Sequence, residues 1–170
     1  MRQWAILVLS VLLLAAPSAL QAQEEDVVIY LVRHAERAED GSDDPPISQE
    51  GWARARMVTR LLQDGGITHI HSTDYQRTRQ TATPTSGVTG VEMQSYDPRD
   101  LPAFAAQLRE MPGRHLVVGH SNTTPQLVEA LGGNSQGPIA EFEYDRLYVV
   151  VISGEQVSSI LLRFGDPYIP

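Results

Sequence analysis

Apolar and polar residues follow one another along this chain in blocks that predict strands and helices in turn. Residues 27–32 form a continuous apolar run, which is typical of a strand buried on both faces. Residues 52, 55, 58 and 62 are spaced as on one face of a helix, with Ser48 as its cap and Gly65-Gly66 as its end. The predicted strands are residues 27–32, 67–71, 91–96, 115–118, 148–152 and 156–164. The predicted helices are residues 48–64, 74–83, 100–111 and 122–131.

Strands that alternate with helices predict an α/β fold. We expect a three-layer sandwich with a mostly parallel central sheet that helices flank on both faces. Pro84 and Gly87 are expected to end the second helix, and residues 153–155 to join the last two strands as a closing hairpin. No internal repeat or second domain is evident, so residues 23–170 are expected to form a single catalytic domain.

The N-terminus has the pattern of a secretory signal peptide. Arg2 precedes an apolar run at residues 5–16, then small residues, then the acidic residues 24–26. The run is shorter than the roughly 20 residues that cross a bilayer as a helix. We therefore expect residues 1–22 to be removed and the protein to be exported, to the periplasm or the medium; a retained membrane anchor is the alternative.

Composition narrows the classes of partner. The net charge of −8 argues against nucleic acid and anionic membranes as partners, so we expect no stable membrane association after signal cleavage. The chain has no cysteine, which excludes disulfides and thiol chemistry. It also has no lysine, so every fixed side-chain cation is an arginine, which binds phosphate through paired hydrogen bonds. Nothing in the sequence indicates the oligomeric state.

Chemically active residues follow three of the predicted strands. Arg33-His34 comes after the first strand, residues 72–77 after the second, and Gly119-His120 after the strand at 115–118. In α/β sheets, sites form at the carboxyl ends of the strands. These residues are therefore expected to meet at one edge of the sheet.

Each of these residues has a functional and a plain structural interpretation. A neutral His34 imidazole could attack phosphorus as a nucleophile, but a lone histidine in a loop is more often only a surface residue. Arg77 could face an anion from a helix, or merely pair with Asp74. His120 follows Gly119, which permits close approach to a ligand, and precedes a helix start that favours phosphate, although a structural histidine is the alternative.

Arg33-His34, the stretch 72–82 with Arg77, and Gly119-His120-Ser121 together resemble the histidine phosphatase superfamily, which includes phosphoglycerate mutase-like proteins. Residues 44–48 and 143–147 also look like stretches of this family. The resemblance implies a phosphoglycerate mutase-like α/β sandwich, with His34 as the phosphorylated nucleophile. It implies that Arg33, Arg77 and His120 form the phosphate pocket with it, and that no metal or other cofactor is needed.

The chain departs from the family pattern at two places, and the second leaves the proton donor open. Ala35 stands where the family usually has glycine, and Ser121-Asn122 where phytase-like members have an aspartate. Asp97 is the first choice for the donor, because burial at the sheet edge could raise its pKa. Asp100 and Glu36 are the alternatives: Asp100 is also a natural helix cap, and Glu36 could instead orient a pocket group.

The expected function is hydrolysis of a small phosphate ester through a phosphohistidine on His34. A non-catalytic phosphate- or sugar-phosphate-binding relative and a phosphoglycerate mutase-type phosphotransferase are the alternatives. His69 and His71 share one face of a strand and could suggest a metal site, but the sequence offers no convincing third ligand. Roles within the strand are favoured for both.

Overall fold

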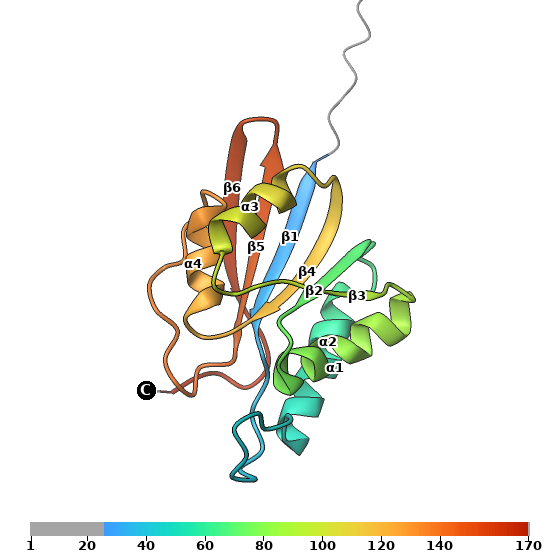
Figure 1. The fold of residues 1–170 in the computed structure, drawn as a ribbon, viewed down its shortest axis with the longest axis vertical. Coiled ribbons are helices and arrows are strands. Elements are labelled where there is room, and N and C mark those ends of the chain that lie inside the picture. Colours follow the sequence, from blue (N-terminus) through green and yellow to red (C-terminus); the bar gives the residue numbers. More distant parts are fainter. Residues whose placement is uncertain (1–25, 170) are drawn as a thin grey trace, which may run out of the picture.

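A six-stranded sheet lies at the centre of the computed structural model, which describes residues 26–169 (Figure 1). The expected signal peptide, residues 1–22, lies outside the described residues. In chain order the elements are β1 (Val27–Arg33), α1 (Gln49–Leu62), β2 (His69–Ser72), α2 (Gln76–Thr89), β3 (Met93–Ser95), α3 (Leu101–Arg109), β4 (Gly113–Gly119), α4 (Thr123–Ala130), β5 (Arg146–Ser153) and β6 (Gln156–Arg163). None of the helices within residues 26–169 is both long and apolar enough to cross a bilayer.

The sheet is mixed rather than mostly parallel, which corrects the expectation from the sequence. Its strand order is β3-β2-β4-β1-β5-β6. The pairings from β3 through β1 are parallel, whereas β5 pairs with β1 and with β6 in antiparallel fashion. The reason is the segment between α4 and β5, which returns to the carboxyl edge of the sheet before β5 begins (Figure 1). β5 therefore starts where β1, β2 and β4 end.

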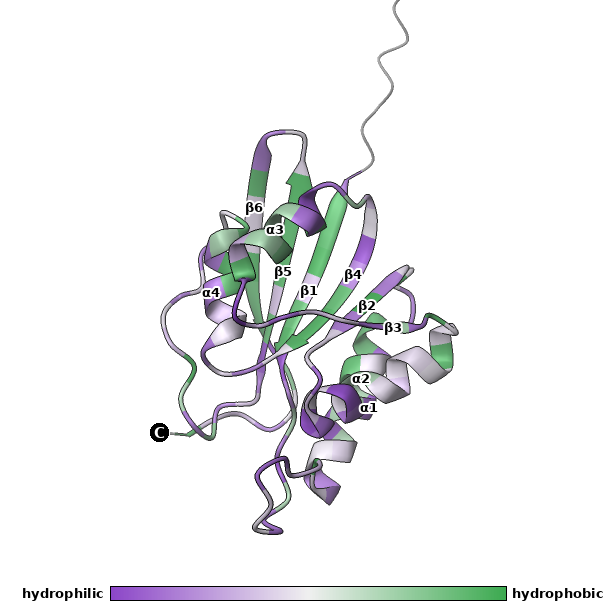
Figure 2. Ribbon diagram, viewed as in Figure 1, coloured by the Kyte–Doolittle hydropathy of each residue, from purple (hydrophilic) through white to green (hydrophobic). Residues whose placement is uncertain are grey.

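The two faces of the sheet are covered by different helix pairs, as a three-layer sandwich requires. Side chains of α3 and α4 pack with Ile29 and Leu31 of β1 and with Val117 of β4. Side chains of α1 and α2 pack with Val32 of β1 and with residues of β2 and β4 on the other face. Alternate residues of a strand point to opposite faces, so β1 contributes to both cores. Figure 2 shows the resulting band of hydrophobic residues through the central strands.

Helix α2 is longer than predicted, because it continues through Pro84 and Gly87 to Thr89 and ends at Gly90 in the left-handed conformation. The prediction that Pro84 breaks this helix is therefore wrong. Packing against α1 outweighs the lost backbone hydrogen bond: Thr85, beyond the proline, is buried, and its Oγ1 lies 2.9 Å from Oγ1 of Thr59 on α1. The helix also begins after Tyr75 rather than at the predicted cap, Asp74.

Close packing of α1 against the chain that follows β1 depends on Gly51. The side chain of Ser48 caps α1 as predicted, accepting a hydrogen bond from the Gly51 nitrogen. A Cβ on Gly51 would lie 2.5 Å from the carbonyl oxygen of Glu36 and 2.8 Å from Cβ of Ile47. The helix could then no longer sit against the segment that leads away from His34.

Replacing Gly51 with alanine is therefore expected to lower the free energy of unfolding by about 1–3 kcal/mol through overpacking. Gly87→Ala is the matched control, because it is also a helical glycine and a Cβ there meets nothing within 4 Å. Chemical denaturation of the two variants gives the comparison. Equal stability of Gly51→Ala and the unmodified protein would contradict the packing argument.

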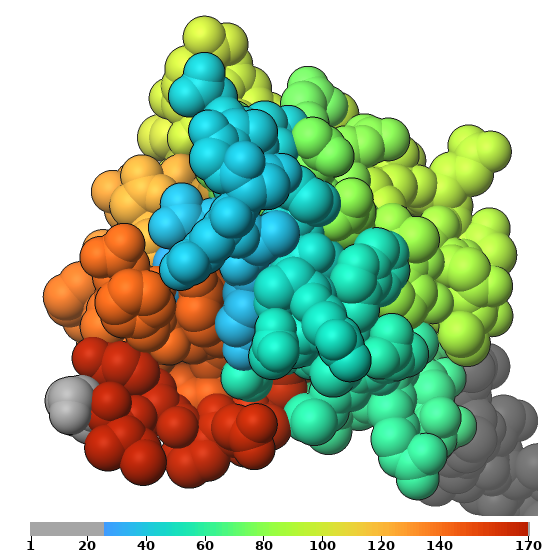
Figure 3. Space-filling model, turned by 90° about the horizontal axis from the view of Figure 1, so that it is seen from below, coloured from blue at the N-terminus to red at the C-terminus, as the bar shows by residue number. Residues whose placement is uncertain are grey.

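The carboxyl edge of the sheet is the lower end of the molecule in Figure 1 and faces the viewer in Figure 3. There the segment after β1, coloured blue to cyan, lies between the orange segment that precedes β5 and the green helix α2. Loops from three separate parts of the chain thus surround the end of β1. This is the edge where the sequence predicted a site.

Candidate active site

His34 follows β1 directly and is held in one tautomer by the backbone. Its nitrogen donates a hydrogen bond to the carbonyl oxygen of Gly119 at 2.8 Å, which extends the β1–β4 pairing by one residue. Its ring Nδ1 lies 2.8 Å from the carbonyl oxygen of Ala35. A carbonyl can only accept, so Nδ1 carries the proton and Nε2 keeps its lone pair.

The environment of His34 also keeps the ring neutral. Burial lowers its pKa to about 3, and the nearby positive charges of Arg33 and Arg77 act in the same direction, against the hydrogen bond to Ala35. The side chain is 4% exposed. At neutral pH the residue is therefore an uncharged imidazole with a free Nε2, the form that a nucleophile requires.

His120 follows β4 and lies beside His34. The centroids of the two rings are 5.5 Å apart, with 65° between the ring planes. Nε2 of His120 lies 3.0 Å from Oγ1 of Thr73, at the end of β2. Burial, together with the positive charges of Arg77 and Arg33, lowers the pKa of His120 to about 4. Three parallel strands thus place two neutral imidazoles in the same pocket.

Arg33 is the buried cation of this pocket. Its Nη1 donates to the carbonyl oxygens of Ala140, at 2.9 Å, and Glu143, at 3.1 Å. Its guanidinium lies 4.1 Å from the centroid of the Tyr144 ring. These contacts come from the segment before β5 and fix the guanidinium next to His34. Burial lowers the pKa of Arg33 from its ordinary value, but an arginine stays charged.

Arg77 approaches from the first turn of α2. Its Nη1 lies 3.3 Å from Oδ1 of Asp44, and its guanidinium lies 4.3 Å from the centroid of the Tyr75 ring. Asp44 also accepts from the backbone nitrogen of Gln76, so one carboxylate anchors both the helix start and the arginine. The alternative pairing of Arg77 with Asp74 does not occur; Asp74 lies 3.9 Å from Arg79 instead.

The two arginines share an unusual feature. Nε of Arg33 and Nε of Arg77 are both buried and have no hydrogen-bond partner among the described residues. A buried donor left without a partner costs about 1–3 kcal/mol. Phosphoryl oxygens accept hydrogen bonds from guanidinium groups readily, so an anion bound between the arginines is a natural partner.

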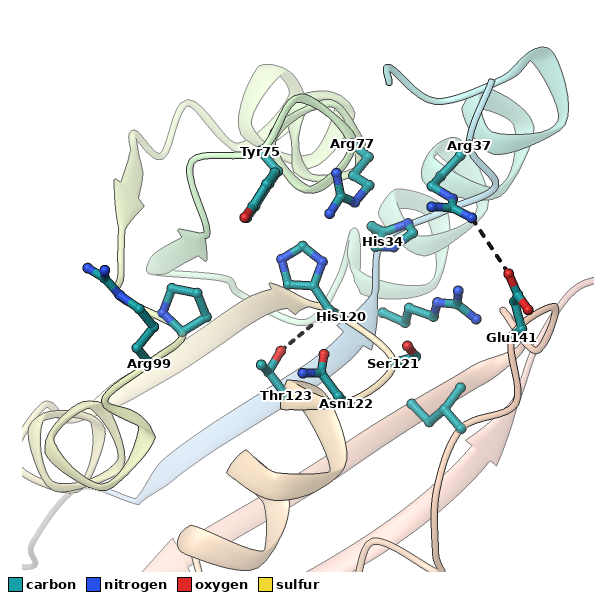
Figure 4. Close-up of a pocket in the computed structure, with 13 residues that line it drawn as sticks. His34, Arg37, Tyr75, Arg77, Arg99, His120, Ser121, Asn122, Thr123 and Glu141 are labelled. Atoms are coloured by element: carbon teal, nitrogen blue, oxygen red, sulfur yellow. Dashed lines mark hydrogen bonds and ion pairs between the residues drawn. The ribbon is translucent and has the colours of Figure 1, made fainter. Parts of the chain in front are cut away.

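These groups line a cavity of about 640 Å³ that opens at the carboxyl edge (Figure 4). Its rim carries two further arginines, Arg37 and Arg99, and one carboxylate, Glu141. Four guanidinium groups against one carboxylate make the pocket strongly positive in a chain of net charge −8. The electrostatic potential inside therefore favours an anionic ligand.

The expectation that Asp97 is a buried acid with a raised pKa is wrong. Asp97 is exposed on the loop after β3, where Arg99 donates to its carboxylate from Nε at 2.9 Å and from Nη2 at 2.8 Å. These hydrogen bonds lower the pKa of Asp97 to about 2. The residue lines a neighbouring hollow rather than the pocket that holds His34.

The two alternative donors are also engaged elsewhere. Asp100 caps α3 by accepting from the nitrogen of Ala103. Glu36 pairs with Arg54 on α1, with 2.7 Å between Oε1 and Nε. Neither lines the pocket.

Sequence reasoning missed the rim residues Arg37, Tyr75, Arg99 and Glu141. Glu141 precedes an antiparallel strand, and only the reversed direction of β5 brings it to this edge. Without the direction of β5, the sequence alone could not have placed Glu141 at this site.

Gly119 also differs from expectation. A Cβ at this position would meet the hydroxyl oxygens of Thr124, Tyr96 and Thr123 within 3.2 Å, so the close approach that this glycine permits is to these side chains.

His69 and His71 of β2 form a stack of three imidazoles with His115 of the neighbouring strand β4. Nε2 of His71 lies 3.1 Å from Nδ1 of His115, and the His69 and His115 ring centroids are 4.5 Å apart. Nε2 of His115 lies 2.8 Å from the carbonyl oxygen of Met111. Within residues 26–169 no group of three or more histidine, cysteine, aspartate or glutamate side chains is arranged to hold a metal ion.

Comparison with known proteins gives one family match and several similar folds. Residues 29–101 match the family model described as "Histidine phosphatase superfamily (branch 1)". A Yersinia pestis protein named "Probable phosphoglycerate mutase GpmB" is 39% identical over 77 residues, which are 42% of this chain and 35% of that protein. The chain thus spans about a third of the length of the curated relatives it matches, and proteins of the same name from Yersinia pseudotuberculosis match equally.

Solved structures extend the likeness over most of the chain. The protein histidine phosphatase SixA complexed with tungstate aligns with a TM-score of 0.63 and 17% identity, over 79% of this chain and 94% of that one. A mycobacterial glucosyl-3-phosphoglycerate phosphatase gives 0.61 and 14%, over 82% and 99%. Phosphoglycerate mutase from Plasmodium falciparum gives 0.56 and 19%, over 86% and 95%. At these identities the likeness establishes the fold alone.

The matched segment contains Arg33, His34 and Arg77, whereas His120 lies beyond it. Residues 29–101 thus match the histidine phosphatase superfamily, and the chain has an α/β fold like that of phosphoglycerate mutase and SixA.

Proposed function

We propose that the protein is a metal-independent phosphomonoesterase that acts through a phosphohistidine on His34. The observation that carries this proposal is the state of His34: a buried, neutral imidazole whose proton is held on Nδ1 by the Ala35 carbonyl, with Nε2 free. A buried histidine with a merely structural role would be expected to use both ring nitrogens or to pack among apolar groups. Here the free nitrogen lies instead in a cavity lined by arginines.

In the proposed reaction, Nε2 of His34 attacks the phosphorus atom of the ester, and the bond from phosphorus to the leaving oxygen breaks. Arg33, Arg77 and His120 donate hydrogen bonds to the remaining phosphoryl oxygens, where negative charge is held in the transition state. The arrival of a dianion would raise the pKa of His120 from about 4 and favour its charged form. Water then attacks the phosphohistidine, which releases phosphate and restores the neutral imidazole.

The shape and charge of the cavity support small or terminal phosphate esters as substrates. Its volume of about 640 Å³ holds a phosphoryl group with a modest leaving group. Most residues of the segment at 36–47 border a separate hollow, and Arg37 is the residue of this segment that lines the cavity.

The test is to incubate the purified protein with p-nitrophenyl phosphate in the presence of EDTA, and to quench the reaction rapidly. Turnover together with an acid-labile phosphoenzyme is the expected result. Failure to hydrolyse this ester or a broad panel of phosphate esters would refute the proposal. Turnover that is lost on chelation would favour a metal-dependent mechanism.

A phosphoglycerate mutase-type phosphotransferase is the second candidate, since the 39% identical segment comes from proteins with that name. Interconversion of 2- and 3-phosphoglycerate without release of phosphate would identify it. A relative that binds phosphate without turnover is the third. Phosphate binding measured by calorimetry, with no hydrolysis and no phosphoenzyme, would identify the protein as such a binding relative.

Export to the periplasm or the medium is proposed on the N-terminal pattern alone. Expression of the whole chain in a bacterium with two membranes, followed by mass spectrometry of the periplasmic fraction, would test it. A product that begins near residue 23 is expected, and a full-length cytoplasmic product would refute the proposal.

A further inference from the structure

The proposed hydrolysis needs an acid that the sequence did not identify. An alkoxide is a poor leaving group, so hydrolysis of an alkyl phosphate requires a proton at the ester oxygen as the bond breaks. Each of the three donors expected from the sequence is engaged elsewhere or lies outside the pocket. Another group that lines the pocket must therefore supply this proton if the enzyme acts on alkyl esters, and a carboxylic acid is one of the common choices.

Glu141 is the only carboxylic acid among the residues that line the His34 pocket, all of which lie in the described part of the chain. It stands on the segment before β5, across the pocket from Tyr75 and Arg99 (Figure 4). The neighbouring carbonyls of Ala140 and Glu143 hold Arg33, so the backbone on both sides of Glu141 is anchored against the pocket.

The carboxylate of Glu141 also makes few contacts with the rest of the protein. Within residues 26–169 it forms a single ion pair, 3.9 Å long, to Nη2 of Arg37, and its side chain is 69% exposed. By contrast, Asp44 on the same side of the sheet accepts three hydrogen bonds, from the backbone of Gln76 and from Arg77. Glu143 is 3% exposed and bound to Arg146 and Arg163. Both carboxylates are thus already bound to protein donors, whereas Glu141 is not held in this way.

We propose that Glu141 is the general acid and base of the reaction. This inference rests on the proposed function and deepens it. When His34 attacks phosphorus, the carboxyl proton of Glu141 passes to the leaving oxygen, which departs as an alcohol. The resulting carboxylate then takes a proton from water as that water attacks the phosphohistidine, and Glu141 ends protonated.

The assignment predicts a dependence on the leaving group. In Glu141→Gln, kcat/KM for ethyl phosphate should fall by about 100-fold, because the ethoxide needs the proton. For p-nitrophenyl phosphate it should fall by less than about threefold, since nitrophenolate leaves without protonation. The variant should still form the phosphoenzyme from this ester and should release nitrophenolate in a burst, because the water that hydrolyses phosphohistidine lacks its base.

Three variants make the result specific. Glu155→Gln, on the exposed turn between β5 and β6, is the matched control and should match the unmodified enzyme on both esters. Arg37→Gln tests whether Glu141 acts only by holding Arg37; if so, the two variants would lose activity alike on both esters. Asp44→Asn tests the carboxylate that pairs with Arg77.

Equal losses on the two esters in Glu141→Gln, or no loss on either, would overturn the assignment while leaving the phosphatase proposal intact. The same holds if Asp44→Asn alone shows the dependence on the leaving group. Failure of the unmodified protein to hydrolyse either ester would overturn the proposed function and this assignment together.

Discussion

Replacing His34 with alanine is expected to lower kcat for p-nitrophenyl phosphate by roughly four orders of magnitude or more, because the variant has no group that can accept the phosphoryl. The acid-labile phosphoenzyme should disappear with it. The fold should persist, since the backbone nitrogen of His34 makes the hydrogen bond to Gly119 and the side chain contributes one local bond to Ala35. Rapid-quench assays on the variant and circular dichroism under the same conditions check both parts.

His69→Gln serves as the control for this variant. His69 is a half-buried histidine on β2 that does not line the pocket, so its loss should leave both turnover and the phosphoenzyme in place. Full activity in His34→Ala would remove His34 from its role and would require another nucleophile. Loss of activity together with loss of the circular dichroism signal would show that His34 is needed for folding instead.

The strands of this fold are easier to predict from the sequence than their directions. β1 and β4 are short apolar runs in the centre of the sheet, where burial on both faces dictates composition, and the closing hairpin at Ser153-Gly154-Glu155 is where the sequence placed it. The antiparallel direction of β5 depends on the path of the segment after α4. No local pattern encodes that path, so the sheet was expected to be mostly parallel.

The end of helix α2 also could not be predicted from local sequence preferences. Pro84 is correctly read as a residue that weakens a helix. The buried contact between Thr85 and Thr59 on α1 is a tertiary interaction, and it keeps the helix intact beyond the proline. Local preference alone could not have anticipated this outcome.

Some residues of the site could be predicted from the strand ends, whereas the acid could not. Arg33, His34, Arg77 and His120 follow or lie near the ends of parallel strands, so the rule for α/β sheets was enough to bring them to one edge. The acid depends instead on which loop carboxylates are free. Asp97 sits at the right strand end, yet Arg99 two residues later neutralises it on the surface, and that contact is a matter of side-chain geometry.

The stacked histidines are expected to make the stability of the folded protein depend strongly on pH. The carbonyl of Met111 fixes the proton of His115 on Nε2, so Nδ1 of His115 accepts, and His71 donates to it from Nε2. Burial, together with the neighbouring His115 and His69, lowers the pKa of His71 to about 3; burial and His69 lower that of His115 to about 4, against the hydrogen bond to Met111. His71 otherwise contacts the ring of Phe104, and the ionisable neighbours that act on it, His115 and His69, both disfavour its charged form.

The sign of the pH dependence follows from these shifts. In the unfolded chain a histidine has a pKa of about 6.5, so between about pH 6.5 and pH 4 the unfolded state binds more protons than the folded state. The free energy of unfolding therefore has its full value above that range and falls as the pH drops through it. Each such histidine contributes a slope of about 1.4 kcal/mol per pH unit, and His34 and His120 add to the pair in the sheet.

Four histidines together give a slope of about 5 kcal/mol per pH unit, against a total stability of about 5–15 kcal/mol for a domain of this size. We therefore expect the free protein to unfold at roughly pH 5. Urea titrations at closely spaced pH values measure the slope directly. His71→Leu should reduce it by about 1.4 kcal/mol per pH unit or more, while lowering stability at pH 7 because Nδ1 of His115 loses its donor.

Phe104→Leu is the matched control for His71→Leu, because it weakens the same core without removing a titrating group and should keep the full slope. The comparison separates the loss of packing from the loss of a proton-binding site. An unchanged slope in His71→Leu would mean that His71 takes up a proton in the folded state as easily as in the unfolded state. The two hydrogen bonds described above, from His71 to His115 and from His115 to the Met111 carbonyl, would then not involve two uncharged imidazoles.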